Sequence, residues 1–246
     1  MSDPDTPLVK RFGSLKGRDV KPVSESMMSF CKCYPKPILP QYRTLVNDLI
    51  QSTHLSVVDA RFKYDAVFAT GLHGIFFKLM RSYPGEGEEK VIFDCLMNCI
   101  DLDPAQVTAD AEGLISWAKS ASEADLEEAM KGEGSSALAA VANAAKEDEF
   151  YLYSKNWGLG LILIMEAAGV ETSEEKMEHF VALLGFPAGK AKQDLLQYKE
   201  VLEKTAQAEQ LFKEIEIREK KKMADRLEEK ARRALEEAAK VESAIN

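Results

Sequence analysis

Apolar side chains recur every three or four residues over most of the chain, and proline or glycine separates the successive stretches. This spacing is that of an α-helix with one buried face. No segment alternates apolar and polar residues between turn signals, as a half-buried strand would. The pattern predicts an all-α fold: an irregular multi-helix domain followed by a long C-terminal coiled-coil-like helix.

Local sequence marks several helix ends. Asp65 is predicted to begin a helix. Asp103 and Ser122 are predicted N-terminal caps, with proline following Asp103 and an acidic residue three positions after Ser122. Thr172 is predicted to cap a later helix, and residues 132–136 read as a flexible joint. The predicted helices span residues 24–33, 40–61, 65–82, 88–100, 104–119, a short stretch from 122, 137–168, 172–184 and the tail.

The chain is predicted to have three parts. Residues 1–21 are polar and read as a disordered leader, residues 22–186 form the helical domain, and residues 187–246 form a long C-terminal helical arm. From Lys190 to Val241 there is no proline or glycine, and a continuous helix would reach roughly 78 Å at ~1.5 Å per residue. A globule of this size cannot bury such a helix, so part of the arm is expected to project or to bind a partner.

The arm carries a short coiled-coil-like seam, in which residues alternate spacings of three and four over less than three heptads. Its members are Tyr198, Val201, Thr205, Ala208, Phe212 and Ile215. We expect this half to pack on its own domain or on a partner. Beyond it the seam resumes one residue out of phase, from Leu227 to Ile245, mostly with alanine, which buries little area. That second half is expected to be a weak seam or a free helix.

A basic run interrupts the seam between residues 218 and 222. It either contacts an acidic protein or an anionic membrane surface, or is a solvated helix face. The coincidence of the interruption with the charges favours contact. The predicted partner-binding residues are therefore Tyr198, Val201, Phe212, Ile215, Arg218, Lys220, Lys221 and Lys222.

Composition excludes several classes of protein. The net charge of −9 argues against bulk nucleic-acid binding, which needs a basic footprint. The longest apolar run, near residues 159–165, is far shorter than the ~20 residues that span a bilayer. Residues 1–21 lack the apolar core of a secretory signal and do not make a convincing transit peptide. Four cysteines in a domain this large favour a reducing compartment over a disulfide framework.

Candidate chemistry is sparse. The three histidines, His54, His73 and His179, fall on different predicted helices, and each reads as a core or surface residue. Cys95 and Cys99 share a helix face and read as small core residues. Their spacing, taken with Cys31-x-Cys33, matches no common zinc pattern.

The glycines at 158 and 160 follow no predicted strand, so they favour close helix packing over a phosphate loop. We therefore predict no enzymatic activity, no catalytic residue, no cofactor and no metal.

Short motifs in a fixed order nevertheless suggest a family. None is specific alone, but their order and spacing hold over residues 22–222, and they resemble the thylakoid formation proteins. The motifs are Pro22-Val23-Ser24-Glu25, Pro35-Lys36-Pro37-Ile38, Phe62-Lys63-Tyr64-Asp65, Phe68-Ala69-Thr70-Gly71-Leu72, Tyr83-Pro84, Asp103-Pro104, Tyr153-Ser154-Lys155, Asp194-Leu195 and Arg218-Glu219-Lys220-Lys221-Lys222. The departures from the family pattern are Ser82, Lys155, Cys31 and Cys33.

The resemblance implies an all-helical, non-enzymatic protein of the chloroplast stroma and thylakoid membrane, or of the cyanobacterial thylakoid, bound peripherally. It implies a role in thylakoid biogenesis and photosystem II repair, through binding and maintaining an FtsH-type membrane protease. Photosystem II-associated proteins are further expected partners. The alternative function is a structural tether that self-associates through the C-terminal helix and links thylakoid membranes or photosystem complexes.

Overall fold

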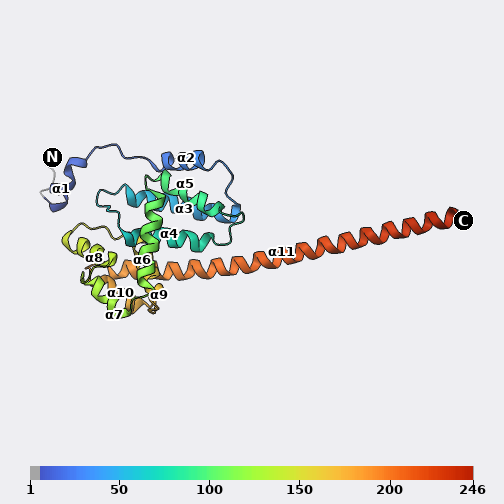
Figure 1. The fold of residues 1–246 in the computed structure, drawn as a ribbon. Helices are drawn as coiled ribbons and strands as arrows, with labels where there is room; N and C mark the ends of the chain where they lie inside the picture. The colour runs from blue at the N-terminus through green and yellow to red at the C-terminus, as the bar shows by residue number, and fades with distance from the viewer. Residues whose placement is uncertain (1–5, 246) are drawn as a thin grey trace. The chain divides into compact units, whose positions relative to one another are not determined.

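The computed structural model describes residues 6–245, and it describes side chains as far as residue 234. Within this range the regular structure is entirely helical (Figure 1), so the predicted all-α fold is confirmed. The elements are α1 (Pro7–Phe12), the 3-10 helix η1 (Gly13–Leu15), α2 (Val23–Cys33), α3 (Pro40–Val57), α4 (Ala66–Met80), α5 (Glu88–Cys99), α6 (Pro104–Ala118), α7 (Glu123–Met130), α8 (Ala137–Glu147), α9 (Lys155–Ala167), α10 (Glu174–Ala182) and α11 (Ala188–Ile245).

Local capping explains where several helices begin. The Asp65 carboxylate accepts hydrogen bonds from the backbone amides of Val67 and Phe68, and Asp103 caps α6 in the same way. Ser122 and Asp125 exchange side-chain to backbone bonds in a capping box at the start of α7. These predictions are confirmed. The cap of α10 is Ser173 rather than the predicted Thr172, because the Ser173 hydroxyl accepts from the Lys176 amide.

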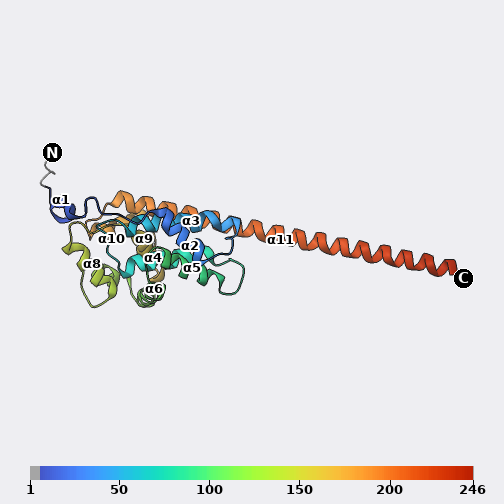
Figure 2. The ribbon, with the colours of Figure 1, turned by 90° about the horizontal axis from the view of Figure 1, so that it is seen from above.

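The core is built around α4 and α9, which pack side by side, with α6 against both (Figure 2). Both central helices are buried over most of their length. Glycine permits the close approach: a Cβ atom at Gly71 would lie 1.8 Å from the Asn156 carbonyl oxygen, and one at Gly160 would lie 1.9 Å from the Val67 oxygen. The predicted role in close helix packing is therefore confirmed for Gly160.

The predicted long helix over residues 137–168 is wrong. The structure has two helices, α8 and α9, separated by residues 148–154. Asp148 is the first residue of the break, with extended backbone, and its carboxylate pairs with both Arg11 and Lys63. Ser154 then caps α9 by accepting from the Trp157 amide. Tertiary ion pairs and a cap interrupt the helix, without any glycine or proline.

The predicted disordered leader contains helical structure over residues 7–15, in α1 and η1, while residues 1–5 lie outside the described residues. Thr6 caps α1, in which Pro7 is the first helical residue. Arg11 of this helix binds Asp148, and Phe12 meets Phe150 edge to face at 5.5 Å between ring centroids. The segment folds because these few side chains find partners on the domain.

Contacts divide the chain into two compact units, residues 1–199 and residues 200–246. The first unit therefore includes the beginning of α11, beyond the predicted domain end at residue 186. The second unit consists of the remainder of α11 and is a single helix over its described residues. The side chains predicted for the second seam beyond residue 234 lie outside the described side chains.

Candidate partner-binding surface

The beginning of α11 is part of the helical domain, which decides the role of Tyr198. Ala191, Leu195 and Tyr198 are buried. The Tyr198 hydroxyl donates a hydrogen bond to Glu166 of α9 over 2.8 Å, and Lys78 of α4 contacts both residues. Burial and the neighbouring carboxylate raise the pKa of Tyr198. The seam was predicted to pack either on its own domain or on a partner. Tyr198 packs on its own domain, so its side chain is not available to a partner.

A buried carboxyl group anchors the same turns. The Tyr153 hydroxyl donates to Asp194 Oδ2 over 3.0 Å, and Lys190 Nζ donates to the Tyr153 carbonyl oxygen over 3.1 Å. Burial raises the pKa of Asp194 above its ordinary value. Gly158 leaves room for this arrangement, since a Cβ atom there would lie 2.1 Å from the Tyr153 hydroxyl. Sequence reasoning missed this anchor, because Tyr153 and Asp194 are 41 positions apart in the chain.

From Glu200 onward the described side chains of α11 leave an apolar stripe accessible. Val201, Phe212 and Ile215 are 42%, 48% and 45% exposed. At ~100° per residue they lie within roughly 60° of one another around the helix. Met223, which sequence reasoning missed, is also exposed and falls on the same side. The sequence feature that could have identified Met223 is its position two helical turns after Ile215. The charged residues between them hid this spacing.

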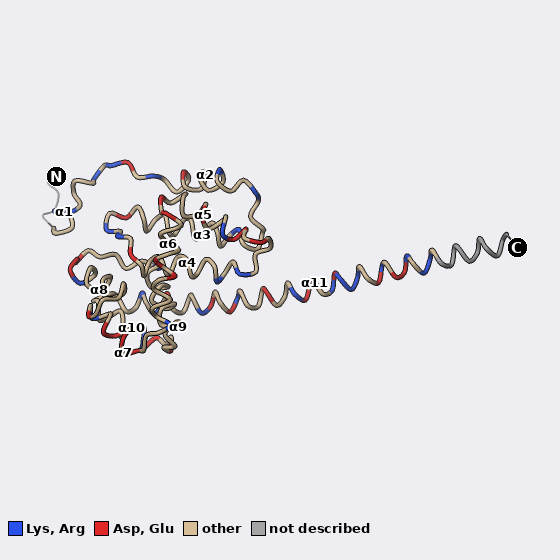
Figure 3. The backbone as a smooth tube through the Cα atoms, viewed as in Figure 1, with Lys and Arg blue, Asp and Glu red and all other residues tan. Residues whose placement is uncertain are grey.

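The predicted basic cluster is accessible and interleaved with carboxylates. Arg218, Lys220, Lys221 and Lys222 are all exposed. Lys220 pairs with Glu216 at 2.6 Å and Lys222 with Glu219 at 3.1 Å, both within the helix. Figure 3 shows the resulting alternation of positive and negative residues along this part of α11. Such exposed pairs add little stability, so an anionic partner can compete for the lysines.

The histidines have structural partners in the helical domain, as predicted. His54 is buried and its Nδ1 lies 3.0 Å from the Ser26 hydroxyl. The His73 ring meets Phe77 and Phe93, and burial lowers its pKa. Within the described residues there is no group of His, Cys, Asp or Glu that would hold a metal ion. In the same part of the chain, no helix is both long and apolar enough to cross a membrane.

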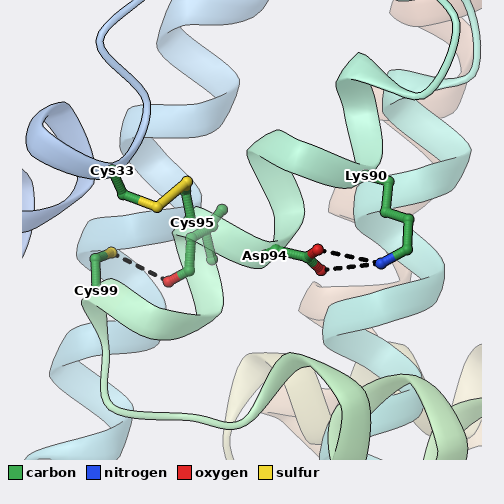
Figure 4. The surroundings of a disulfide bond; sticks show 6 residues. Cys33, Lys90, Asp94, Cys95 and Cys99 are labelled. Carbon is green, nitrogen blue, oxygen red and sulfur yellow. Dashed lines mark hydrogen bonds and ion pairs between the residues drawn. A yellow bond between two sulfur atoms is a disulfide. The ribbon is translucent and has the colours of Figure 1, made fainter.

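The cysteines differ from expectation. Cys33 of α2 and Cys95 of α5 form a disulfide, with 5.5 Å between their Cα atoms (Figure 4). The cysteine count, which favoured a reducing compartment over a disulfide framework, did not predict this bond, and Cys95 is not simply a small core residue. Packing of α2 on α5 brings together two cysteines 62 positions apart, a proximity that spacing along the chain does not reveal. Cys99 is a buried free thiol, as predicted for a core residue, and Cys31 is an exposed one.

Together, the fold and this surface define a class of protein: all-helical, with an exposed amphipathic helix that carries an apolar stripe beside basic side chains. Residues 22–227 match the thylakoid formation protein family, and the chain belongs to that family. The resemblance predicted from the motifs is thus confirmed.

The relatives come from plants and cyanobacteria. The chain is 33% identical over 210 residues to the chloroplastic protein THYLAKOID FORMATION 1 of Arabidopsis thaliana, covering 85% of this chain and 70% of that protein. It is 29% identical over 220 residues to protein Thf1 of Crocosphaera subtropica, covering 86% of this chain and 91% of the relative. These relatives confirm the predicted location, which is the chloroplast or the cyanobacterial thylakoid.

A solved structure shares the fold. The structure of Psb29 is similar to this chain with a TM-score of 0.73 and 26% sequence identity. The similarity covers 83% of this chain and all of the Psb29 chain.

Membership of the thylakoid formation protein family indicates a role in thylakoid biogenesis. The family is named for that role rather than for a catalysed reaction.

Proposed function

We propose that this protein is a non-enzymatic thylakoid biogenesis and photosystem II repair factor that binds and maintains an FtsH-type thylakoid membrane protease. The contact is assigned to the partner stripe, defined as Val201, Phe212, Ile215 and Met223. The observation that carries the proposal is the exposure of these side chains on a helix that is otherwise highly charged. An exposed apolar stripe on an amphipathic helix is a recurring means of binding a groove on another protein.

The basic cluster is assigned a supporting role. Arg218, Lys220, Lys221 and Lys222 lie just beyond Ile215, so a partner that covers the stripe meets these charges at its edge. Charges at the rim of an interface change the rate of association more than the affinity. They also attract the protein to anionic lipid, at about 1 kcal/mol for each basic residue near the surface. Peripheral contact with the thylakoid membrane is part of the proposal.

An affinity capture from detergent-solubilised thylakoids tests it. The full chain is compared with a variant carrying Phe212→Glu and Ile215→Glu, and recovery of FtsH-type protease is measured by immunoblot. We expect the double variant to lose most of the recovered protease, because two charges would be buried in the interface. The control is Ile217→Glu, which introduces one glutamate at an exposed residue on the other side of the helix.

The outcomes separate the possible contacts. Equal recovery with the full chain and the double variant would move the contact to the helical domain. Loss with the Ile217 variant as well would indicate a general effect of added negative charge. Reversal of Lys220, Lys221 and Lys222 to Glu is expected to weaken recovery in a salt-dependent way, because long-range attraction is screened by ions.

The second candidate function is the self-associating tether. Its supporting observation is the three-and-four spacing of the seam residues Val201, Thr205, Ala208, Phe212 and Ile215, which is the spacing found in a two-stranded coiled coil. In this case light scattering would detect a concentration-dependent dimer that the Phe212→Glu and Ile215→Glu variant no longer forms. A monomer at all concentrations, together with protease recovery, would exclude the tether.

A further inference from the structure

All four cysteines of the chain lie where α2 meets α5. Cys31 and Cys33 are two positions apart at the end of α2, and Cys95 and Cys99 are one turn apart on α5. Cys33 and Cys95 are joined, and Cys31 and Cys99 are free. Figure 4 shows the bond between the two helices, with Cys99 one turn further along α5. The proposed partner-binding function uses none of these residues.

The two ends of the disulfide differ in access. Cys33 is exposed, whereas Cys95 is 4% exposed. A thiolate approaching from solvent therefore meets the Cys33 sulfur, and the Cys95 sulfur is the leaving group. Exposed disulfides are the ones that exchange readily with external thiols, in contrast to buried structural ones.

The remaining free thiol of α5 does not compete for this bond. Cys99 is buried, its Sγ donates to the Leu96 carbonyl oxygen over 3.1 Å, and burial raises its pKa to about 12. The thiolate is the reactive form, so Cys99 remains a poor nucleophile at neutral pH. Cys99 therefore does not open this bond, whereas a thiol from another molecule can reach the exposed Cys33.

The disulfide is one of several contacts that hold α2. Phe30 is buried, Ser26 meets His54, and Tyr34 donates to Glu88 at the start of α5 over 2.7 Å. The packing contacts of a large core persist when the covalent bond is opened. Opening would therefore loosen α2 without unfolding the domain, which is what a reversible modification requires.

We propose that the Cys33–Cys95 bond is a thiol–disulfide exchange site whose substrate is a dithiol oxidoreductase protein of the thioredoxin class, and that its state sets how firmly α2 is held on α5. One thiolate of the reductant attacks Cys33 Sγ, forms a mixed disulfide and releases Cys95, which takes up a proton. The second thiol of the reductant then displaces Cys33, which is also protonated. Two electrons and two protons pass to this chain, and the reductant becomes a disulfide.

The test uses the full oxidised chain in its folded state. It is incubated with thioredoxin, thioredoxin reductase and NADPH, quenched in acid and unfolded, and its thiols are counted by the mass added on maleimide labelling. We expect two labelled cysteines before reduction, Cys31 and Cys99, and all four afterwards. Four at the start would show that the bond does not form. Reduction only after unfolding would identify a structural bond that no dithiol protein reaches, and either result overturns the proposal.

A trapping variant identifies the attacked sulfur. Thioredoxin whose second active-site cysteine is replaced by serine is expected to remain attached to Cys33, as mapped by peptide mass spectrometry. The variant Cys31→Ser is the matched control and keeps the attachment, whereas Cys33→Ser abolishes it. Attachment at Cys31 instead would overturn the assignment.

Hydrogen exchange tests the effect on α2. Amides of residues 23–33 are expected to exchange about tenfold or more faster in the reduced chain, while those of α4 and α9 stay unchanged. Equal rates in both states would overturn the part of the proposal that concerns α2.

Discussion

Asp194 and Asp65 are carboxyl groups held inside the helical domain, each facing a tyrosine hydroxyl. Tyr153 donates to Asp194 over 3.0 Å, and Tyr151 donates to Asp65 over 2.6 Å. Burial raises the pKa of both carboxyls, and the hydrogen bonds oppose that shift only in part. Asp148 is the opposite case, because Lys63 and Arg11 hold its pKa below the ordinary value. Environment, rather than residue type, therefore sets the charge that each carboxyl favours.

The raised pKa of Asp194 predicts a pH-dependent stability. A group whose pKa is higher in the folded chain contributes stability that is fully present below its unfolded value of 3.8 and is lost as pH rises through the folded value. The variant Asp194→Asn keeps the shape and does not titrate. We measure the free energy of unfolding of both chains in urea. The value for wild type minus the value for Asp194→Asn is expected to fall as the pH rises from 4 to 7. A constant difference across this range would contradict the prediction.

At the scale of elements, the contact between α4 and α9 depends on glycine residues, which have no side chain. Gly71→Ala would place a Cβ atom 1.8 Å from a backbone oxygen of α9, which cannot move away as a flexible side chain would. Overpacking of this kind costs ~1–3 kcal/mol of unfolding free energy.

A matched helical glycine provides the control for this prediction. A Cβ atom at Gly113 of α6 would meet nothing within 4 Å. Gly113→Ala is expected to stabilise the protein by ~0.5–1 kcal/mol, through the intrinsic helix preference of alanine. Thermal and urea unfolding measure both variants. A loss of stability at Gly113 equal to that at Gly71 would contradict the packing explanation.

At the scale of the whole molecule, the question is where the independently stable part ends. The side chains of Ala191, Leu195 and Tyr198 are buried, whereas nearly all described side chains beyond Lys199 are exposed. A chain ending after Lys199 is therefore expected to unfold at the same temperature as the full chain. A chain ending after Pro187 is expected to lose roughly 3–6 kcal/mol, because it loses the burial of Leu195 and Tyr198.

Circular dichroism melting of the three chains provides the measurement. Equal stability of both shortened chains would place the boundary at residue 187. Lower stability of both would show that residues beyond Lys199 also stabilise the fold.

The sequence predicted what short stretches determine. The caps at Asp65, Asp103 and Ser122 act on amides two or three residues away, so the local sequence reveals them. The apolar stripe of α11 was visible for the same reason. The break after α8, the ordered leader and the disulfide depend on contacts between distant residues, which periodicity does not encode. Tyr198 was predicted to bind a partner because the spacing of a seam residue is the same whether it packs on its own domain or on another protein.

The arrangement of Gly158, Tyr153 and Asp194 restricts how this family can diverge at these positions. A side chain at residue 158 would occupy the place of the tyrosine hydroxyl, and loss of that hydroxyl would leave the buried carboxyl without its donor. Replacement of Asp194 by an apolar residue would in turn leave the buried Tyr153 hydroxyl without its acceptor. A single change at any of the three positions therefore costs stability, and the three positions are expected to change together among descendants of this sequence.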